Sequence, residues 1–160
     1  MSTDSPYSER DIAKATNLAA FLGWSVFAVP LAILLGPIAL PFAMILGLPI
    51  AFGTCWIVGA PIIRRLMRRS VSWHKAALGG AIISAGMVVL SVIVGRIYGY
   101  RQSIDPTSSS QFGGGDFTRE VDGILTAYGW MKLGERGVMF VFLGIAIALI
   151  VRAVVGSGRV

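Results

Sequence analysis

The chain has 160 residues, of which 55% are hydrophobic and only 14% are charged, and its mean hydropathy is +0.75. This composition excludes an ordinary water-soluble domain, because it supplies too little polar surface to cover a globule of this length. The formal net charge is +6, and the single cysteine, Cys55, excludes an internal disulfide. We therefore expect an all-α integral membrane protein.

A long uncharged run lies near the N-terminus. No Asp, Glu, Lys, Arg or His occurs from Ala15 to Ile63, which is more than one spanning helix of about 20 residues can use. The Gly36-Pro37 step favours a break there, since proline cannot donate a backbone hydrogen bond. The sequence predicts an N-terminal tail at 1–16, then two helices at 17–35 and 38–63 that form a tight hairpin over 17–63.

A cleaved signal peptide is the competing interpretation of the first apolar segment. Its apolar region is, however, longer than the roughly 7 to 15 residues of a signal peptide, and the leader carries Asp4, Glu9 and Asp11. These features favour a retained transmembrane helix.

Proline recurs every twelve residues in the second segment, at Pro37, Pro49 and Pro61. Twelve residues of a straight α-helix rotate about 120° beyond whole turns, so the sequence predicts that these prolines do not share a face. We expect Pro49 to bend the helix as a structural kink rather than to act as a hinge.

Small residues recur every fourth position in two of the predicted spans. Such ridges let helix backbones approach closely in lipid, where hydrophobicity supplies little drive for association. The competing explanation is that Gly and Ala are simply common in membrane helices. The predicted helix-packing residues are Ala43, Gly47, Ala51, Cys55 and Gly59 in the second span, and Ala77, Ala81 and Ala85 in the third.

Two further apolar segments follow a basic loop at 64–75. The third span is predicted at 76–95 and the fourth at 138–155, with a C-terminal tail at 156–160. The fourth span is long enough only if Arg152 extends to the headgroups. The basic loop predicts contact with anionic lipid headgroups, each cation contributing about 1 kcal/mol. Its cationic residues are Arg64, Arg65, Arg68, Arg69 and Lys75.

Lysine and arginine counts predict the orientation of these four spans. Nine basic residues fall in the two tails, the loop at 64–75 and the C-terminal end of the fourth span, where Arg152 lies, against five in the loop at 96–137. Because basic residues favour the cytoplasmic side, both termini and the basic loop are expected to be cytoplasmic, at a plasma membrane such as the bacterial inner membrane.

The outer loop at 96–137 changes character along its length. A Ser- and Gly-rich linker is followed by a segment whose apolar residues have helical spacing, which predicts an amphipathic helix at about 116–132. This helix is expected either to lie on the membrane or to dock on a partner protein. Its apolar face consists of Phe117, Val121, Ile124, Leu125 and Tyr128.

The spans carry no constellation of catalytic type, and one histidine cannot form a metal site of ordinary spacing. We therefore expect no enzyme activity, no cofactor and no nucleic-acid partner. The favoured hypothesis is a four-helix transmembrane bundle that acts as an accessory or structural subunit, packing against other membrane proteins or against itself. The alternative is a small oligomeric channel or passive permease.

Overall fold

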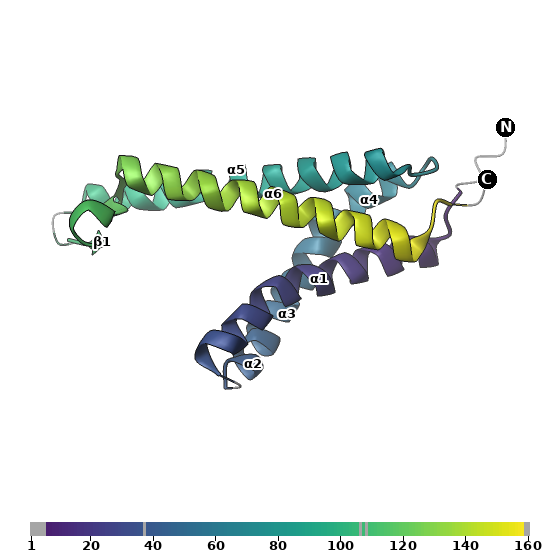
Figure 1. Ribbon diagram of the computed structural model, residues 1–160, viewed down its shortest axis with the longest axis horizontal. Helices are drawn as coiled ribbons and strands as arrows, with labels where there is room; N and C mark the ends of the chain where they lie inside the picture. Colours follow the sequence, from purple (N-terminus) through teal and green to yellow (C-terminus); the bar gives the residue numbers. More distant parts are fainter. Residues whose placement is uncertain (1–5, 37, 106, 108, 159–160) are drawn as a thin grey trace. The chain divides into compact units, whose positions relative to one another are not determined.

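The computed structural model describes residues 6–36, 38–105, 107 and 109–158 (Figure 1). In this part of the chain, four helical stretches are long and apolar enough to cross a membrane: Glu9–Leu35, Leu40–Leu66, Trp73–Ser103 and Ala127–Val155. The chain is thus mostly helical with four candidate spans. Its elements are α1 (Glu9–Leu35), α2 (Ala39–Phe42), η1 (Ala43–Gly47), α3 (Leu48–Thr54), η2 (Cys55–Gly59), α4 (Ala60–Leu66), α5 (Trp73–Ser103), β1 (Gln111–Phe112), η3 (Gly115–Phe117), β2 (Glu120–Val121), β3 (Ile124–Leu125) and α6 (Ala127–Val155).

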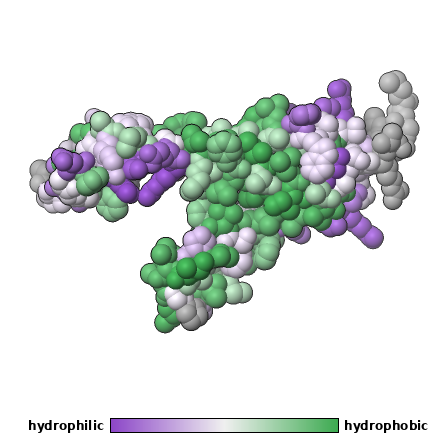
Figure 2. All heavy atoms as spheres, in the orientation of Figure 1, coloured by the Kyte–Doolittle hydropathy of each residue, from purple (hydrophilic) through white to green (hydrophobic). Residues whose placement is uncertain are grey.

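The chain forms two compact units, which we describe separately. The first unit comprises Met1–Gly80 and Ile145–Val160, and the second comprises Ala81–Gly144. In Figure 2, hydrophilic side chains gather near the start of α1 and again around the short strands, whereas the helices are covered largely by hydrophobic side chains. This distribution agrees with helices that lie in an apolar solvent.

The first helix begins earlier than the sequence predicts, at Glu9 rather than at residue 17. Ser8 caps it in a capping box, in which the Ser8 hydroxyl accepts from the Asp11 N–H and an Asp11 carboxylate oxygen accepts from the Ser8 N–H. The helix ends at Leu35, as predicted, because Gly36 adopts a positive φ of 76°. Pro37 lies outside the described residues.

The second span is one helical stretch interrupted by two π turns. The Leu48 N–H donates to Ala43 O, and the Ala60 N–H donates to Cys55 O, so that each turn contains one residue more than an α-helical turn. Pro49 and Pro61 follow these turns, in the first turn of α3 and α4 respectively. The wider turn accommodates a ring that would otherwise clash with the carbonyl four residues earlier.

The π turns overturn the expectation that the twelve-residue repeat points in different directions. With one inserted residue, twelve positions rotate like eleven α-helical ones, which is only about 20° beyond three turns. Burial repeats accordingly in AMILGLPI and CWIVGAPI: Gly47 and Gly59 are half-buried, and Pro49 and Pro61 are exposed. Pro49 and Pro61 therefore lie on one face of the second span.

A small apolar cluster closes one end of the first unit. Tyr7 and Ile12 pack there with Met67 and Val71, and Val155 packs against them. The Tyr7 hydroxyl donates to Gly156 O at 3.2 Å and accepts from the Val71 N–H at 3.4 Å. The start of α1, the connection from α4 to α5 and the end of α6 therefore meet at the same end of this unit.

Arg152 lies in the last turn of α6, which ends at Val155 as predicted. Its side chain contacts the protein: Nε donates to Val71 O at 2.5 Å, and the guanidinium lies 5.1 Å from the centre of the Trp73 ring. The charge is thus held by a backbone carbonyl and an aromatic face. It fixes the end of α6 to the α4–α5 connection.

In the second unit, the amphipathic helix predicted at 116–132 is wrong, although the chain as a whole is mostly helical. Strands β1, β2 and β3 form an antiparallel sheet in that order, and α6 begins only at Ala127. The β2–β3 hairpin turns through Asp122 and Gly123, which both have positive φ, 46° and 78°. A two-residue Asp-Gly loop of this kind matches the twist of the flanking strands. A helix cannot continue through two such residues.

Glycines bring this sheet close to the neighbouring helices. A Cβ on Gly99 of α5 would clash with the carbonyl of Gly123, and one on Gly129 of α6 would clash with the carbonyl of Arg119. Thr126 starts α6 by accepting from the Gly129 N–H at 3.0 Å, while its hydroxyl donates to Thr118 O. The outer segment is therefore a structured hairpin anchored to both helices.

Candidate functional site

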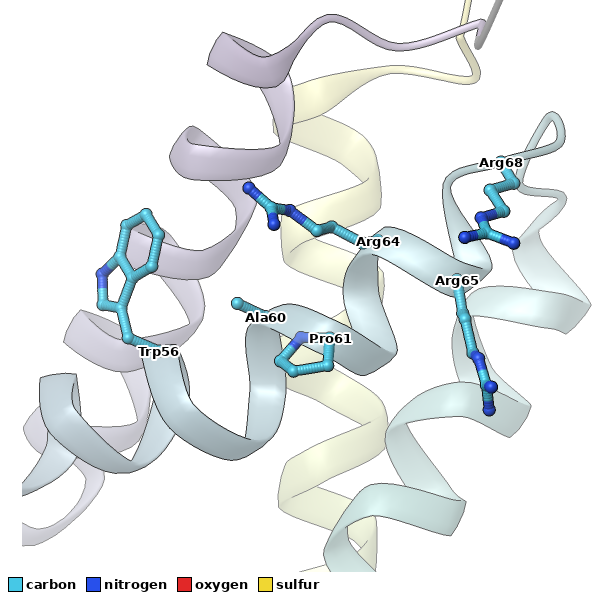
Figure 3. A pocket seen from close by; sticks show the side chains of 6 residues that line it. All are labelled: Trp56, Ala60, Pro61, Arg64, Arg65 and Arg68. Atoms are coloured by element: carbon cyan, nitrogen blue, oxygen red, sulfur yellow. The ribbon is translucent and has the colours of Figure 1, made fainter. Parts of the chain in front are cut away.

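An open groove of about 340 Å³ lies along η2 and α4 in the first unit (Figure 3). Its lining changes character along the helix, from apolar residues at one end to three cationic residues at the other. The lining residues are Trp56, Ala60, Pro61, Arg64, Arg65 and Arg68. The groove thus combines an apolar floor with a positively charged end.

The four-residue spacing of the second span produces this arrangement. Trp56, Ala60 and Arg64 follow one another at helical spacing, and Pro61 and Arg65 form a second row beside them. Trp56 precedes Arg64 by eight residues, which corresponds to about 12 Å along a helix axis. The indole is held in place because Trp56 Nε1 donates to Asn17 Oδ1 of α1 at 3.0 Å.

The three arginines of the groove differ in their electrostatic surroundings. Arg64 forms an ion pair with Glu9 of α1, with Nη2 2.9 Å from Oε2. Figure 3 shows its side chain extending toward α1, whereas the side chain of Arg65 extends away from α1. Within the described residues neither Arg65 nor Arg68 has an acidic partner, so their two charges are available to an anion.

The other predicted headgroup residues lie outside the groove. Arg69 and Lys75 are exposed, and they do not contribute to its lining. Sequence reasoning treated the five cations of the loop as equivalent, and it missed Trp56 and Pro61. The available signal was the spacing of Trp56, Ala60 and Arg64 on one helical face.

The predicted packing residues of the second span lie on its less exposed side, against which α1 packs. Trp24 of α1 donates from Nε1 to Ala43 O at 2.8 Å, and a Cβ on Gly47 would lie 3.4 Å from the indole. Ala51, Cys55 and Gly59 are half-buried. In α5, Ala77 and Ala81 are half-buried and Ala85 is exposed.

The predicted partner face occurs on the hairpin and the start of α6 rather than on one helix. Val121 and Ile124 are paired across β2 and β3 and are both exposed, whereas Leu125 is half-buried. Phe117 makes an edge contact with Tyr128, with ring centres 5.7 Å apart. Arg96 lies 3.6 Å from a carboxylate oxygen of Glu120 and 5.8 Å from the centre of the Trp130 ring.

The described residues contain no group of three or more His, Cys, Asp or Glu side chains that could hold a metal ion. What the groove can do chemically is bind: guanidinium groups donate paired hydrogen bonds to phosphate or carboxylate oxygens, and indole and proline rings contact apolar chains. Comparisons of the chain with protein-family models, with curated proteins and with solved structures found no match.

Proposed function

We propose that this is a non-catalytic membrane protein that acts as an accessory or structural subunit, packing its helices against other membrane proteins or a second copy of itself. Its membrane is a plasma membrane, the inner membrane in a bacterium, with both termini and the basic loop in the cytoplasm. The observation that carries this proposal is the chemistry of the span surfaces, which offer apolar side chains and small residues as contacts.

Polar groups of the spans serve the chain's own backbone and neighbours. The Thr16 hydroxyl donates to Ile12 O and the Ser25 hydroxyl donates to Leu22 O, each one turn earlier in α1. The Trp24 indole N–H donates to Ala43 O of the second span. Large apolar side chains such as Leu34 and Ile57 are exposed instead. Such surfaces associate in lipid through close packing rather than through solute coordination.

The hairpin of the second unit is a further contact surface for a partner's outer domain. Its exposed apolar residues include Phe112, Val121 and Ile124. A packed interface concentrates its energy in a few shape-matched anchors. The alternative is that these residues rest on the bilayer surface, where apolar area alone decides the binding energy.

Purification under mild detergent tests the proposal. We expect the chain to migrate in a complex heavier than its own 17.0 kDa. Ala85→Leu, on the exposed end of the α5 ridge, should reduce the yield of that complex by more than Ala146→Leu, since Ala146 is an exposed alanine outside the ridges. A chain that stays monomeric contradicts the proposal. A homo-oligomer that conducts solute in planar bilayers supports the channel instead.

A further inference from the structure

The groove of η2 and α4 has a composition that no packing role requires. A helix that only packs against other helices gains nothing from two unpaired arginines next to an indole and a proline ring. Among the described residues, Arg65 and Arg68 have no acidic partner, although Arg64 beside them is paired with Glu9. Two cations are thus kept without a partner at one end of an apolar groove.

We propose that this groove binds one anionic glycerophospholipid, with its phosphate held by Arg65 and Arg68 and its glycerol backbone and upper acyl chain lying along Pro61, Ala60 and Trp56. This inference rests on the membrane location proposed above and not on the subunit role. Arginine suits the phosphate because its planar guanidinium donates two parallel hydrogen bonds to two oxygens.

Dimensions and position fit a lipid better than a soluble phosphate ester. Arg65 lies in the last turn of α4 and Arg68 just beyond it, where the second span ends. Trp56 precedes Arg65 by nine residues and so lies about 13 Å deeper along the helix, at a depth suited to the glycerol and upper acyl region rather than to water. Tryptophan is favoured at this level of a bilayer. A soluble phosphate would leave the apolar floor of the groove unused.

Charge decides between classes of lipid. The Glu9 carboxylate neutralises Arg64, so the groove retains the two positive charges of Arg65 and Arg68. A lipid with a net negative headgroup, such as phosphatidylglycerol, gains from both charges. Phosphatidylcholine carries its own quaternary ammonium, which these arginines repel.

Native mass spectrometry of the purified full chain in mild detergent tests this inference. The probes are dioleoyl phosphatidylglycerol, dioleoyl phosphatidylcholine and glycerol 3-phosphate, titrated separately at about 0.3 M salt so that general surface attraction is screened. We expect one phosphatidylglycerol to bind saturably and more tightly than phosphatidylcholine. Glycerol 3-phosphate should not displace it at equal concentration.

Two charge-matched double variants separate the groove from the loop as a whole. R65Q/R68Q should weaken phosphatidylglycerol binding at least about tenfold, whereas R69Q/K75Q, which removes two exposed charges outside the groove, should weaken it less than about threefold. R65K/R68K keeps both charges but loses the paired hydrogen bonds, so its affinity for phosphatidylglycerol should fall about threefold. This variant replaces R65Q/R68Q in the test if R65Q/R68Q does not fold.

Equal losses in R65Q/R68Q and R69Q/K75Q overturn the inference, because they indicate a diffuse surface charge. Equal affinity for phosphatidylcholine, or displacement by glycerol 3-phosphate, also overturns it. Resistance of the chain to carbonate extraction from membranes reports on the membrane location separately. A chain that carbonate extracts contradicts the proposed membrane location. A chain that resists extraction but shows no groove-dependent binding contradicts only the lipid site.

Discussion

At the residue scale, Trp24 determines how closely α1 approaches the second span. Its indole N–H donates to Ala43 O, the same carbonyl that accepts from Leu48 N–H in the first π turn. Gly47 lies beside the ring, where an added Cβ would be 3.4 Å from two indole atoms. The contact therefore depends on the absence of a side chain at residue 47.

Gly47→Leu should accordingly destabilise the protein, because a large side chain there must displace Trp24 and break its hydrogen bond. We expect the free energy of unfolding to fall by about 2 kcal/mol, within the usual range for overpacking. Gly53→Leu is the matched control, since nothing lies within 4 Å of a Cβ at that position. Denaturation in detergent micelles, followed by circular dichroism, measures both. Equal stabilities for the two variants would contradict the close approach.

Tyr7 makes the second contact that depends on one side chain. Its hydroxyl joins Gly156 O to the Val71 N–H, and the residue is only 5% exposed. Tyr7→Phe removes both hydrogen bonds and should lower the unfolding free energy by about 1 to 2 kcal/mol. Tyr100→Phe, at a residue that is 67% exposed, should leave it unchanged. Thermal unfolding of the two variants in the same micelle provides the comparison. If Tyr7→Phe left the unfolding free energy unchanged, the hydroxyl would have no stabilising role.

At the element scale, local chemistry explains two departures from regular helix. The π turns η1 and η2 each precede a proline, and each keeps the following α-helical segment in register with the repeat. The β2–β3 hairpin is determined by Asp122 and Gly123, whose positive φ values end any helical continuation. In both cases one or two residues determine the backbone conformation of a whole segment.

The hairpin also depends on its approach to α5, through Gly99 and Gly123. Gly99→Ala places a methyl group against the Gly123 carbonyl, whereas Gly95→Ala, one turn earlier, meets nothing within 4 Å. We expect Gly99→Ala to raise the hydrogen-exchange rate of the sheet amides about tenfold, because the hairpin loses its anchor on α5. The reporting amides include Arg119 and Asp122, which donate to Phe112 O and Ser110 O. If Gly95→Ala raised exchange equally, the effect would belong to the helix and not to the contact.

At the scale of the whole molecule, the four candidate spans and the basic residues make a definite topology testable. The N-terminal segment, the α4–α5 connection and the end of α6 meet in the first unit, through Tyr7, Val71 and Arg152. If the four candidate spans cross a membrane, these three segments therefore lie on the same side of it. That requirement agrees with an even number of spans between these segments.

Cysteine labelling in intact cells tests this topology after Cys55→Ser removes the native thiol. Ser70→Cys and Ser157→Cys should be protected from an impermeant maleimide, because the proposed topology puts both residues in the cytoplasm, and Ser109→Cys should react. All three positions are exposed in the structure. Labelling of Ser157→Cys but not of Ser70→Cys would contradict the packing of the first unit. Labelling of all three, or of none, would contradict the four-span topology.

The sequence by itself determined that the chain is mostly helical and that it has four candidate spans. Charge-free runs and charged boundaries are properties of consecutive residues, so they can be recognised without any knowledge of packing. The end of α1 at Leu35 was predicted from the Gly36-Pro37 step, which is also a property of consecutive residues, and Gly36 has a positive φ. The helix α6 also ends at the predicted residue, Val155, although that prediction rested on Arg152 and not on Gly156. The bounds toward the outer segment were less accurate.

That outer segment was misassigned because its pattern supports two structures. The spacing of Phe117, Val121 and Ile124 fits a helical face, and it also fits a hairpin that turns at Asp122-Gly123. The dipeptide was a usable hairpin signal that helical periodicity outweighed. The contacts of Gly99 and Gly129 with distant backbone, which fix the hairpin, have no counterpart in local sequence.

Only the tertiary structure distinguished among the cations of the basic loop. Arg64, Arg65 and Arg68 look equivalent along the chain, yet Glu9, 55 positions away from Arg64, pairs with that residue. Likewise Arg152 has its carbonyl partner at Val71, 81 positions earlier. The physical reason is that electrostatic surroundings depend on distance in space, which a single sequence does not record. Composition gives this chain four candidate membrane spans, and packing between distant segments determines which cation of the basic loop pairs with a carboxylate.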